Sequence, residues 1–198
     1  MPLSQATPLL LREPGFLFSA LLASAEPLHA AAGSNYDADP WPVAWIPWGP
    51  TLEGSVFGHA TNVEPIRVAE LFEAVAYSVT EVTTTLAFAV SNYTLHNLAR
   101  AMNAPSSAVT TVSGTGATLS SKLEPPDPEN IIRRMIGWES LDHTLRLVGR
   151  QCLNGGEIQS NFARGATPAG IATVWNFERP PAGKAFAWYG SGVGRLGS

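Results

Sequence analysis

The residues that could catalyse a reaction or bind a metal are few and widely spaced. The four histidines, His29, His59, His96 and His143, stand thirty or more residues apart and form neither an HxH nor an HExxH pattern. The single cysteine, Cys152, excludes an internal disulfide and a multi-cysteine zinc site. Because no histidine is near it in the sequence, we expect Cys152 to be a small buried apolar residue. The sequence therefore predicts no metal site and no cofactor.

No pair of residues indicates nucleophilic or acid–base catalysis. His143 follows Asp142 directly, and adjacent residues on a strand point to opposite faces, so a dyad is not expected there. The other aspartates lie beside proline-rich loops, where they usually cap turns. The glycine-rich runs 114–116 and 190–194 do not connect a strand to a helix, as a phosphate-binding loop does. We therefore expect a protein that is not an enzyme.

The composition favours a protein whose surface is covered by partners. Hydrophobic residues make up 45% of the chain and charged residues 14%, against roughly 25% charged residues in an ordinary soluble domain. Only two lysines are present, Lys122 and Lys184, although lysine is the residue that usually keeps neighbouring copies apart. The high apolar content disfavours disorder, and a pI near 5.5 disfavours electrostatic binding of nucleic acid. Residues 1–100 are acidic and residues 101–198 slightly basic, a distribution that favours head-to-tail association of copies.

Residues 1–50 form an irregular stretch in which three tryptophans stand among prolines that prevent a helix. We expect an extended N-terminal arm that leads into the core. The apolar run Phe16–Ala25 imitates a secretory signal, but Glu13 neutralises Arg12, and Pro14–Gly15 interrupts the approach. We expect a structural strand there instead, because about ten residues are too few to cross a bilayer as a helix.

Residues 81–90 alternate with the period of a half-buried strand. Two further strands are predicted at Ile66–Leu71 and Ala74–Val79, separated by an acidic kink around Glu73. One face of the strand 81–90 is predicted to lie in the subunit core and holds Val82, Thr84, Leu86, Phe88 and Val90. The other face has mostly short side chains and holds Glu81, Thr83, Thr85, Ala87 and Ala89.

One short helix is predicted at about 94–103. Thr94 can cap its N-terminus, and it ends before Pro105. Apolar residues at i, i+3, i+4 and i+7 predict a stripe that packs on a sheet, and its members are Leu95, Leu98, Ala99 and Met102. The Ser/Thr-rich residues 106–121, within a loop at about 106–128, predict a hairpin or a long exposed loop.

The C-terminal part predicts further strands at 131–140 and 144–152, the second with a cationic edge made by Arg146 and Arg150. A terminal hairpin pairs residues 170–178 with residues 184–190. Together these elements indicate a single domain over 1–198, with its core in 51–189 and a flexible C-terminal tail at 190–198.

The order of these elements resembles that of a known family. The runs GFLFSALLASAEPL, WIPWGPTLEGSVFGHATN and EPIRVAELFEAVAYSVTEVTTTLAFAVSNYTLHNLARAMN stand in the order found in the major tail tube protein of long-tailed (siphovirus-type) bacteriophages, especially those with non-contractile tails. In that family a strand pair leads to a helix of the type TLHNLARAM, then to a Ser/Thr/Gly-rich segment and further strands. The resemblance covers roughly residues 12–190 and is one of layout.

The resemblance implies a mainly β fold, a β-sandwich or barrel with one short flanking α-helix, a long N-terminal arm and a long loop. It also implies hexameric rings that stack head to tail into a tube, through which DNA passes on ejection into the host. The expected partners are other copies of the chain, the tape-measure protein, and the tail terminator and tail-tip proteins. The expected location is the virion tail, assembled in the cytoplasm of the bacterial host without membrane insertion.

On this hypothesis the face formed by Glu81, Thr83, Thr85, Ala87 and Ala89 lines the lumen. The predicted core then holds Val82, Leu86, Phe88, Val90, Leu95, Leu98 and Met102, although the period alone leaves the opposite assignment of the two strand faces open. Contacts between rings are expected at residues 106–121, the N-terminal arm and the C-terminal tail.

Three other functions stay open at this point. The first is the inner tube of a contractile injection system, which shares the fold. The second is a small-ligand β-barrel, suggested by the aromatic residues Trp175, Phe177, Phe186 and Trp188. The third is a hydrolase, for which the sequence offers no nucleophile–base pair.

Overall fold

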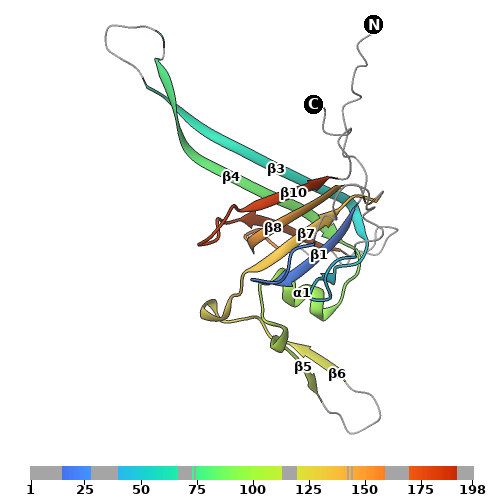
Figure 1. Cartoon of the computed structure of the whole chain (residues 1–198). Helices are drawn as coiled ribbons and strands as arrows, with labels where there is room; N and C mark the ends of the chain where they lie inside the picture. Colours follow the sequence, from blue (N-terminus) through green and yellow to red (C-terminus); the bar gives the residue numbers. More distant parts are fainter. Residues whose placement is uncertain are drawn as a thin grey trace, which may run out of the picture.

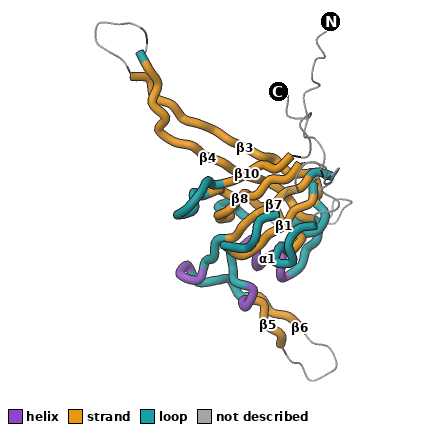
Figure 2. Tube along the Cα trace, viewed as in Figure 1, coloured by secondary structure: helices purple, strands orange, loops and turns teal. Residues whose placement is uncertain are grey.

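A computed structural model describes residues 15–27, 40–66, 73, 75–112, 120–141, 143, 145–158 and 170–190. Within these residues the chain is mainly β, with antiparallel pairing and one α-helix (Figures 1 and 2). The helix is α1 (Leu95–Ala101), and two short 3₁₀ helices are η2 (Ser106–Ala108) and η3 (Pro128–Asn130). The strands are β1 (Phe16–Leu21), β2 (Ile46–Pro47), β3 (Thr51–Ile66), β4 (Ala76–Val90), β5 (Val109–Val112), β6 (Ser120–Leu123), β7 (Arg134–Glu139), β8 (Leu145–Asn154), β9 (Ile171–Phe177) and β10 (Phe186–Gly190).

Strand β8 connects the two layers of the body. The described strands of the main sheet run in the order β2-β1-β7-β8-β9-β4-β3, and β10 also pairs with β8. On the edge of β8 opposite β7, residues 145–149 pair with β10 and residues 152–154 pair with β9. The sheet therefore divides near Arg150, so that β1, β7 and β10 form one layer with the first half of β8, and β9, β4 and β3 form the other.

This division shows that the predicted terminal hairpin is wrong. Residues 170–178 and 184–190 do form strands, but β9 pairs with β4 and β8, and β10 pairs with β8. The two strands do not pair with each other because β8 is long enough to offer successive stretches of one edge to each of them. The long connection through Pro180 and Pro181 lets the chain change layers.

The main core lies between the two layers. Its largest fully buried side chains are Trp48 and Trp175, whose rings meet edge to face with centroids 6.0 Å apart. Trp48 meets Phe88 in the same way at 5.6 Å, a geometry that aromatic pairs prefer. From the strand 81–90, Leu86, Phe88 and Val90 are buried in this core. Leu17 of β1 and Leu147 of β8 complete it from the opposite layer.

A smaller core covers the other face of the layer that contains β1, β7 and β8. Ala20, Met135 and Val148 are buried there beneath Trp45, with Trp41 packed alongside. A Cβ at position 137 would lie 2.4 Å from the Trp41 ring, so Gly137 is needed for this approach. The structure thus changes the expected role of residues 1–50.

The described part of residues 1–50 belongs to the body rather than to an arm that leads into it. Strand β1 lies between β2 and β7, which confirms a structural strand at the start of the run Phe16–Ala25. Trp45 and Trp48 are almost fully buried. The core therefore begins well before the expected residue 51, because the middle of the sheet needs β1.

Helix α1 begins as predicted but buries a different face. The Thr94 side chain accepts a hydrogen bond from the Asn97 amide, and Asn103 takes a left-handed φ of 56° beyond the helix end. The buried helical residues are Asn97, Ala99 and Ala101, while Leu98 is half-buried against the core. Small side chains let the helix approach closely, and the Asn97 amide donates to the carbonyls of Trp48 and Asn92, each at 2.9 Å.

Two core assignments on the helix are consequently wrong. Leu95 and Met102 are half-buried rather than buried, because the helix turns its alanine side toward the body.

The segment after the helix forms a hairpin. Strands β5 and β6 pair antiparallel from Val109 opposite Leu123 to Val112 opposite Ser120, apart from the main sheet. Figure 1 shows this hairpin projecting from the end of the body that carries α1. Residues 113–119 lie outside the described part of the chain. In the part that is described, no helix is long and apolar enough to cross a membrane.

Candidate interaction surface

Strands β3 and β4 form a ribbon much longer than the body needs. They pair from Thr51 opposite Val90 to Ile66 opposite Ala76. Strands in globular proteins usually have 3–10 residues, whereas β3 has 16 and spans about 50 Å at the usual rise per residue. Figure 1 shows the two strands leaving the body together. We call the described residues 61–66, 73 and 75–83 the arm.

Aromatic side chains anchor the base of the arm. The Phe57 ring of β3 lies 5.6 Å from the ring of Phe186 and 5.3 Å from that of Trp188, both on β10. His59 Nδ1 lies 2.8 Å from the Thr84 hydroxyl. Thr84 is buried, and the β4 residues 76–83 before it are exposed. The body therefore ends between Thr83 and Thr84, and the ribbon continues without support from another layer.

One face of the arm is apolar. Directly opposed residues share a face of an antiparallel pair, so the pairs Val63–Val79 and Pro65–Tyr77 lie together. Val82 lies on the same side. All five residues are exposed, Tyr77 at 67% and Val79 at 59%. We call Val63, Pro65, Tyr77, Val79 and Val82 the arm face.

The arm face continues the side of the ribbon that packs on the core inside the body. Alternation along β3 places Val63 on the side of Phe57, which packs against the main core. On β4 the register shifts between Glu81 and Val79, so Thr80 is an extra residue that keeps Val79 and Val82 on one face. The assignment of Val82 to the subunit core is wrong, because it is 56% exposed and lies beyond the end of the body.

The edges of the arm are acidic. Glu64, Glu73 and Glu81 are all exposed, and the described part of the arm holds no lysine or arginine. The Glu81 carboxylate accepts hydrogen bonds from the Asn62 amide (3.1 Å) and the Thr83 hydroxyl (3.4 Å). The arm therefore combines an apolar face with negative charge.

The predicted lumen-facing residues occupy the opposite side of the same ribbon. Within the body this side also holds Val56 and Val174, which are exposed, so no described layer covers it. Lining of a channel by this face stays a prediction. The five residues divide by environment: Glu81 and Thr83 are exposed on the arm, and Thr85, Ala87 and Ala89 are half-buried in the body.

A second apolar surface lies at the other end of β3. A cavity of about 380 Å³ opens between the start of β1 and the segment that leads into β3. We call it the groove; its main lining residues are Phe16, Leu17, Pro47, Pro50, Thr51 and Leu141. Phe16 and Leu141 are 43% and 42% exposed, and the Thr51 hydroxyl is buried without a hydrogen-bond partner.

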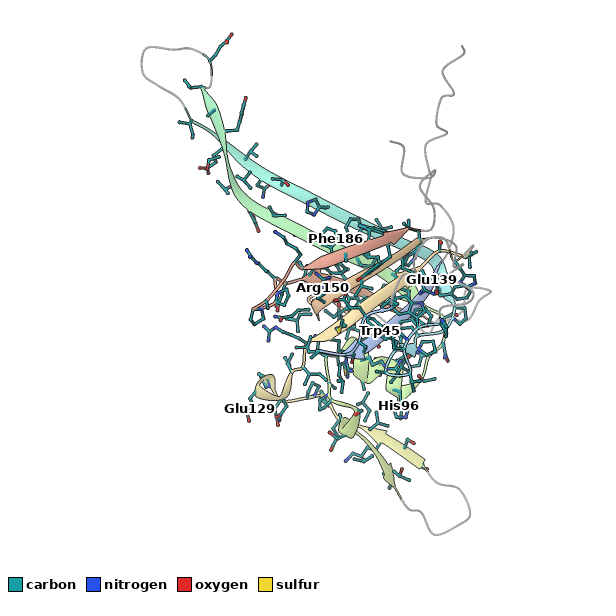
Figure 3. All side chains as sticks on the ribbon, in the orientation of Figure 1. Trp45, His96, Glu129, Glu139, Arg150 and Phe186 are labelled. Carbon is teal, nitrogen blue, oxygen red and sulfur yellow. The ribbon has the colours of Figure 1, made fainter. Side chains whose placement is uncertain are left out.

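A buried ion pair lies under the tryptophan segment. The Glu139 carboxylate accepts hydrogen bonds from Arg146 Nε (2.8 Å) and Trp41 Nε1 (2.7 Å), and His143 Nδ1 lies 3.3 Å away. Figure 3 shows Glu139 within the body, on the side of Trp45. Arg146 is only 2% exposed. The expected cationic edge on β8 is therefore wrong at Arg146, because β8 lies inside the sheet with β7 on one side and β10 on the other.

Two further carboxylates bind cations of the second half of the chain. Glu26 accepts two hydrogen bonds from Arg150, at 2.6 and 3.1 Å, and one from the Tyr189 hydroxyl. The bonds from Arg150 lower the pKa of Glu26, and burial raises the pKa of Tyr189. Glu178 accepts from Arg133 Nε at 2.5 Å and from Gln151 at 2.8 Å, and its pKa is lowered chiefly by the Arg133 bond.

The described residues place few reactive groups together. Cys152 is fully buried, and burial raises the pKa of its thiol, so the nucleophilic thiolate is disfavoured. His143 has a left-handed φ of 56° in the turn between β7 and β8, and its ring stacks on Phe16. Asp142 lies outside the described residues. Among the residues that are described, no group of three or more His, Cys, Asp and Glu side chains is placed to hold a metal.

The arm is the feature that the sequence analysis missed. It expected ring contacts at residues 106–121, the N-terminal arm and the C-terminal tail; residues 1–14, 113–119 and 191–198 lie outside the described chain. A usable signal was present. Strand-like patterns run from Thr51 to Val90 with one interruption, and two strands of that length exceed the width of a body of this size.

Comparison with known proteins adds no relative. No protein family matches the chain, and no curated protein matches it. The functional argument therefore depends on the arm and on the surfaces described above.

Proposed function

We propose that this protein is a structural protein that assembles with copies of itself into rings, and that the rings stack into a tube of the kind found in the tails of long-tailed bacteriophages. The observation that carries the proposal is the arm face, an apolar surface on a ribbon that no other layer covers. Apolar burial stabilises contacts by roughly 25 cal/mol per Å².

The arm needs a partner for stability as well as for burial. An isolated two-stranded ribbon is marginally stable in water, and a third strand or a packed layer is usually required. Large exposed apolar patches on soluble proteins mark interaction sites. A second copy of the chain is the partner that best explains the low charge content, because lysine-poor surfaces suit subunits that are covered by neighbours.

The tube, rather than another assembly, is supported by the resemblance in the order of elements. On this proposal rings of six copies stack head to tail, and the side of β4 that holds Thr83, Thr85 and Ala87 faces the channel. The small uncharged side chains on this side would offer little to retain DNA phosphates. The tape-measure, terminator and tail-tip proteins would be the partners at the lumen and the ends. The same argument serves the inner tube of a contractile system.

The small-ligand alternative receives less support. A cavity between the layers, lined in part by Phe57, Leu86 and Trp188, measures about 270 Å³. Sites for small ligands usually measure roughly 300–1,000 Å³. Trp175 is fully buried against Trp48 and is not among the lining residues.

The proposal is tested by the state of the purified full-length protein over a range of concentrations. We expect sedimentation velocity to show mass that grows with concentration, and negative-stain electron microscopy to show rings or tubes of constant width. A single monomeric species that persists at the highest concentration in both measurements would contradict the proposal.

A further inference from the structure

The arm face and the groove are two apolar surfaces that cannot meet within one chain. The groove includes Thr51 at the start of β3, whereas the arm extends to Ile66 at its end, about 50 Å away along the strand. Both surfaces are exposed, and they differ in shape: one is a ribbon and the other a cavity. Two different complementary surfaces on one molecule define a heterologous contact, which generates rings or filaments.

We propose that the groove of one copy is the binding site for the arm face of the next copy. This inference rests on the proposed function and deepens it, because it names the surface that receives the arm. Side chains of the size of Tyr77 and Val79 would enter the cavity beside Phe16 and Leu141.

The shape of the groove fits an extended segment. Its wall is the edge of β1 that β2 leaves open, since β2 pairs only with Phe18 and Ser19. The Trp48 amide donates to the carbonyl of Leu17, so the backbone groups of this edge point toward the groove side. The buried Thr51 hydroxyl has no partner in the single chain. An incoming strand can supply polar backbone groups to such an edge, the mode known as β-augmentation.

The charges of the two surfaces are complementary. The arm carries Glu64, Glu73 and Glu81, whereas none of the residues that line the groove is acidic. Arg100 reaches the groove from α1, where its Nη1 donates to the carbonyl of Pro47 at 3.2 Å. His143 lies at the other side, stacked on Phe16. Opposite charges near an interface favour the correct partner and its orientation.

Pairs of cysteines test the contact in the full chain. Tyr77→Cys on the arm face is combined with Leu141→Cys at the groove, and the assembled protein is treated with a short bifunctional thiol reagent. The native Cys152 is fully buried and should not react. We expect a ladder of dimers, trimers and higher species on a denaturing gel. The matched control combines Tyr77→Cys with Val112→Cys on the β5–β6 hairpin, and we expect at least tenfold less cross-linked product.

Other outcomes overturn the inference in distinguishable ways. Rings or tubes without a ladder above the control would remove the groove as the receiving site and leave the proposed function in place. Dimers from Tyr77→Cys alone, with nothing larger, would indicate that two arms pair symmetrically. Absence of any assembly by sedimentation would overturn the proposed function as well.

A second pair of variants does not depend on cross-linking. Leu141→Asp places a carboxylate at the mouth of the groove, where it would face the acidic arm, while Leu141→Met keeps the apolar character. We expect loss of assembly in the first and assembly like that of the unchanged protein in the second. Equal assembly of both variants would contradict the inference.

Discussion

At the scale of single residues, Asn154 joins three parts of the body. Its amide nitrogen donates to the carbonyl of Ala101 at the end of α1 (2.7 Å), and its amide oxygen accepts from the backbone of Val174 (2.9 Å) and Gly156 (3.3 Å). Asn103 closes the arrangement by exchanging two hydrogen bonds with the Asn154 backbone. Both side chains are almost fully buried. Such a network fixes the helix against β8 and β9 because each member would be costly to leave unpaired.

Asn154→Ala should therefore destabilise the fold by about 3 kcal/mol, since buried backbone groups lose their partners and each costs about 1–3 kcal/mol. The free energy of unfolding would be measured by urea titration followed by tryptophan fluorescence. Asn130→Ala, at an exposed asparagine in η3, is the matched control and should change stability by less than about 0.5 kcal/mol. A similar value for the two variants would show that the network contributes little.

At the scale of elements, the β3–β4 ribbon meets two environments with one sequence pattern. Between Thr84 and Val90 the alternation places every second side chain in the core. Beyond Thr84 the same apolar face continues through Val82 and Val79, but no layer lies under it. The bulge at Thr80 preserves the face across the change of register. The ribbon thus presents a face with the composition of a core and no core of its own.

The arm should be removable without loss of the fold. Ala60 and Thr83 are directly opposed, so replacement of residues 61–82 by Asn-Gly would close the ribbon with a two-residue turn. We expect the free energy of unfolding of the body to change by less than about 1 kcal/mol, because the removed residues contribute nothing to the described cores. We also expect a monomer in sedimentation velocity at every concentration tested.

Two outcomes would contradict this prediction. Assembly of the shortened chain at the concentration that suffices for the full chain would show that the arm is dispensable for association. Loss of cooperative unfolding would show instead that the arm stabilises the body.

At the scale of the whole molecule, charge is separated between the arm and the body. The described arm is acidic, while Arg179 and Lys184 are exposed in the β9–β10 connection and form no ion pair with a described residue. The other arginines there, Arg133 and Arg150, are already paired with carboxylates. This separation agrees with the acidic and basic halves of the sequence, and it favours contacts in which the arm of one copy meets a less acidic surface of another.

Charge reversal on the arm should weaken assembly in a salt-dependent way. We expect Glu64→Lys combined with Glu81→Lys to raise the protein concentration needed for assembly by about tenfold at low ionic strength, with a smaller effect at high salt where charges are screened. Light scattering over a concentration series gives the measurement. Glu124→Lys combined with Glu129→Lys makes the same change of charge near η3 and should have a smaller effect. Equal effects would attribute the result to net charge alone.

The sequence by itself determined the class of structure and several local features. Strand 81–90, the cap at Thr94 and the hairpin near residues 109–123 follow from side-chain periodicity and capping chemistry, which act over a few neighbouring residues. It also gave the correct sidedness of β4, including the side on which Val82 lies.

Only the tertiary structure decided where the body ends and which strands pair. Periodicity names two faces of a strand and cannot say whether anything lies against them, so Val82 could be assigned to a face but not to a core. The separation of β9 from β10 depends on the length of β8, and the burial of Arg146 depends on its distant neighbours Glu139 and Trp41. The arm and the groove are made by residues far apart in the chain, because packing, unlike local pattern, is a property of the whole fold.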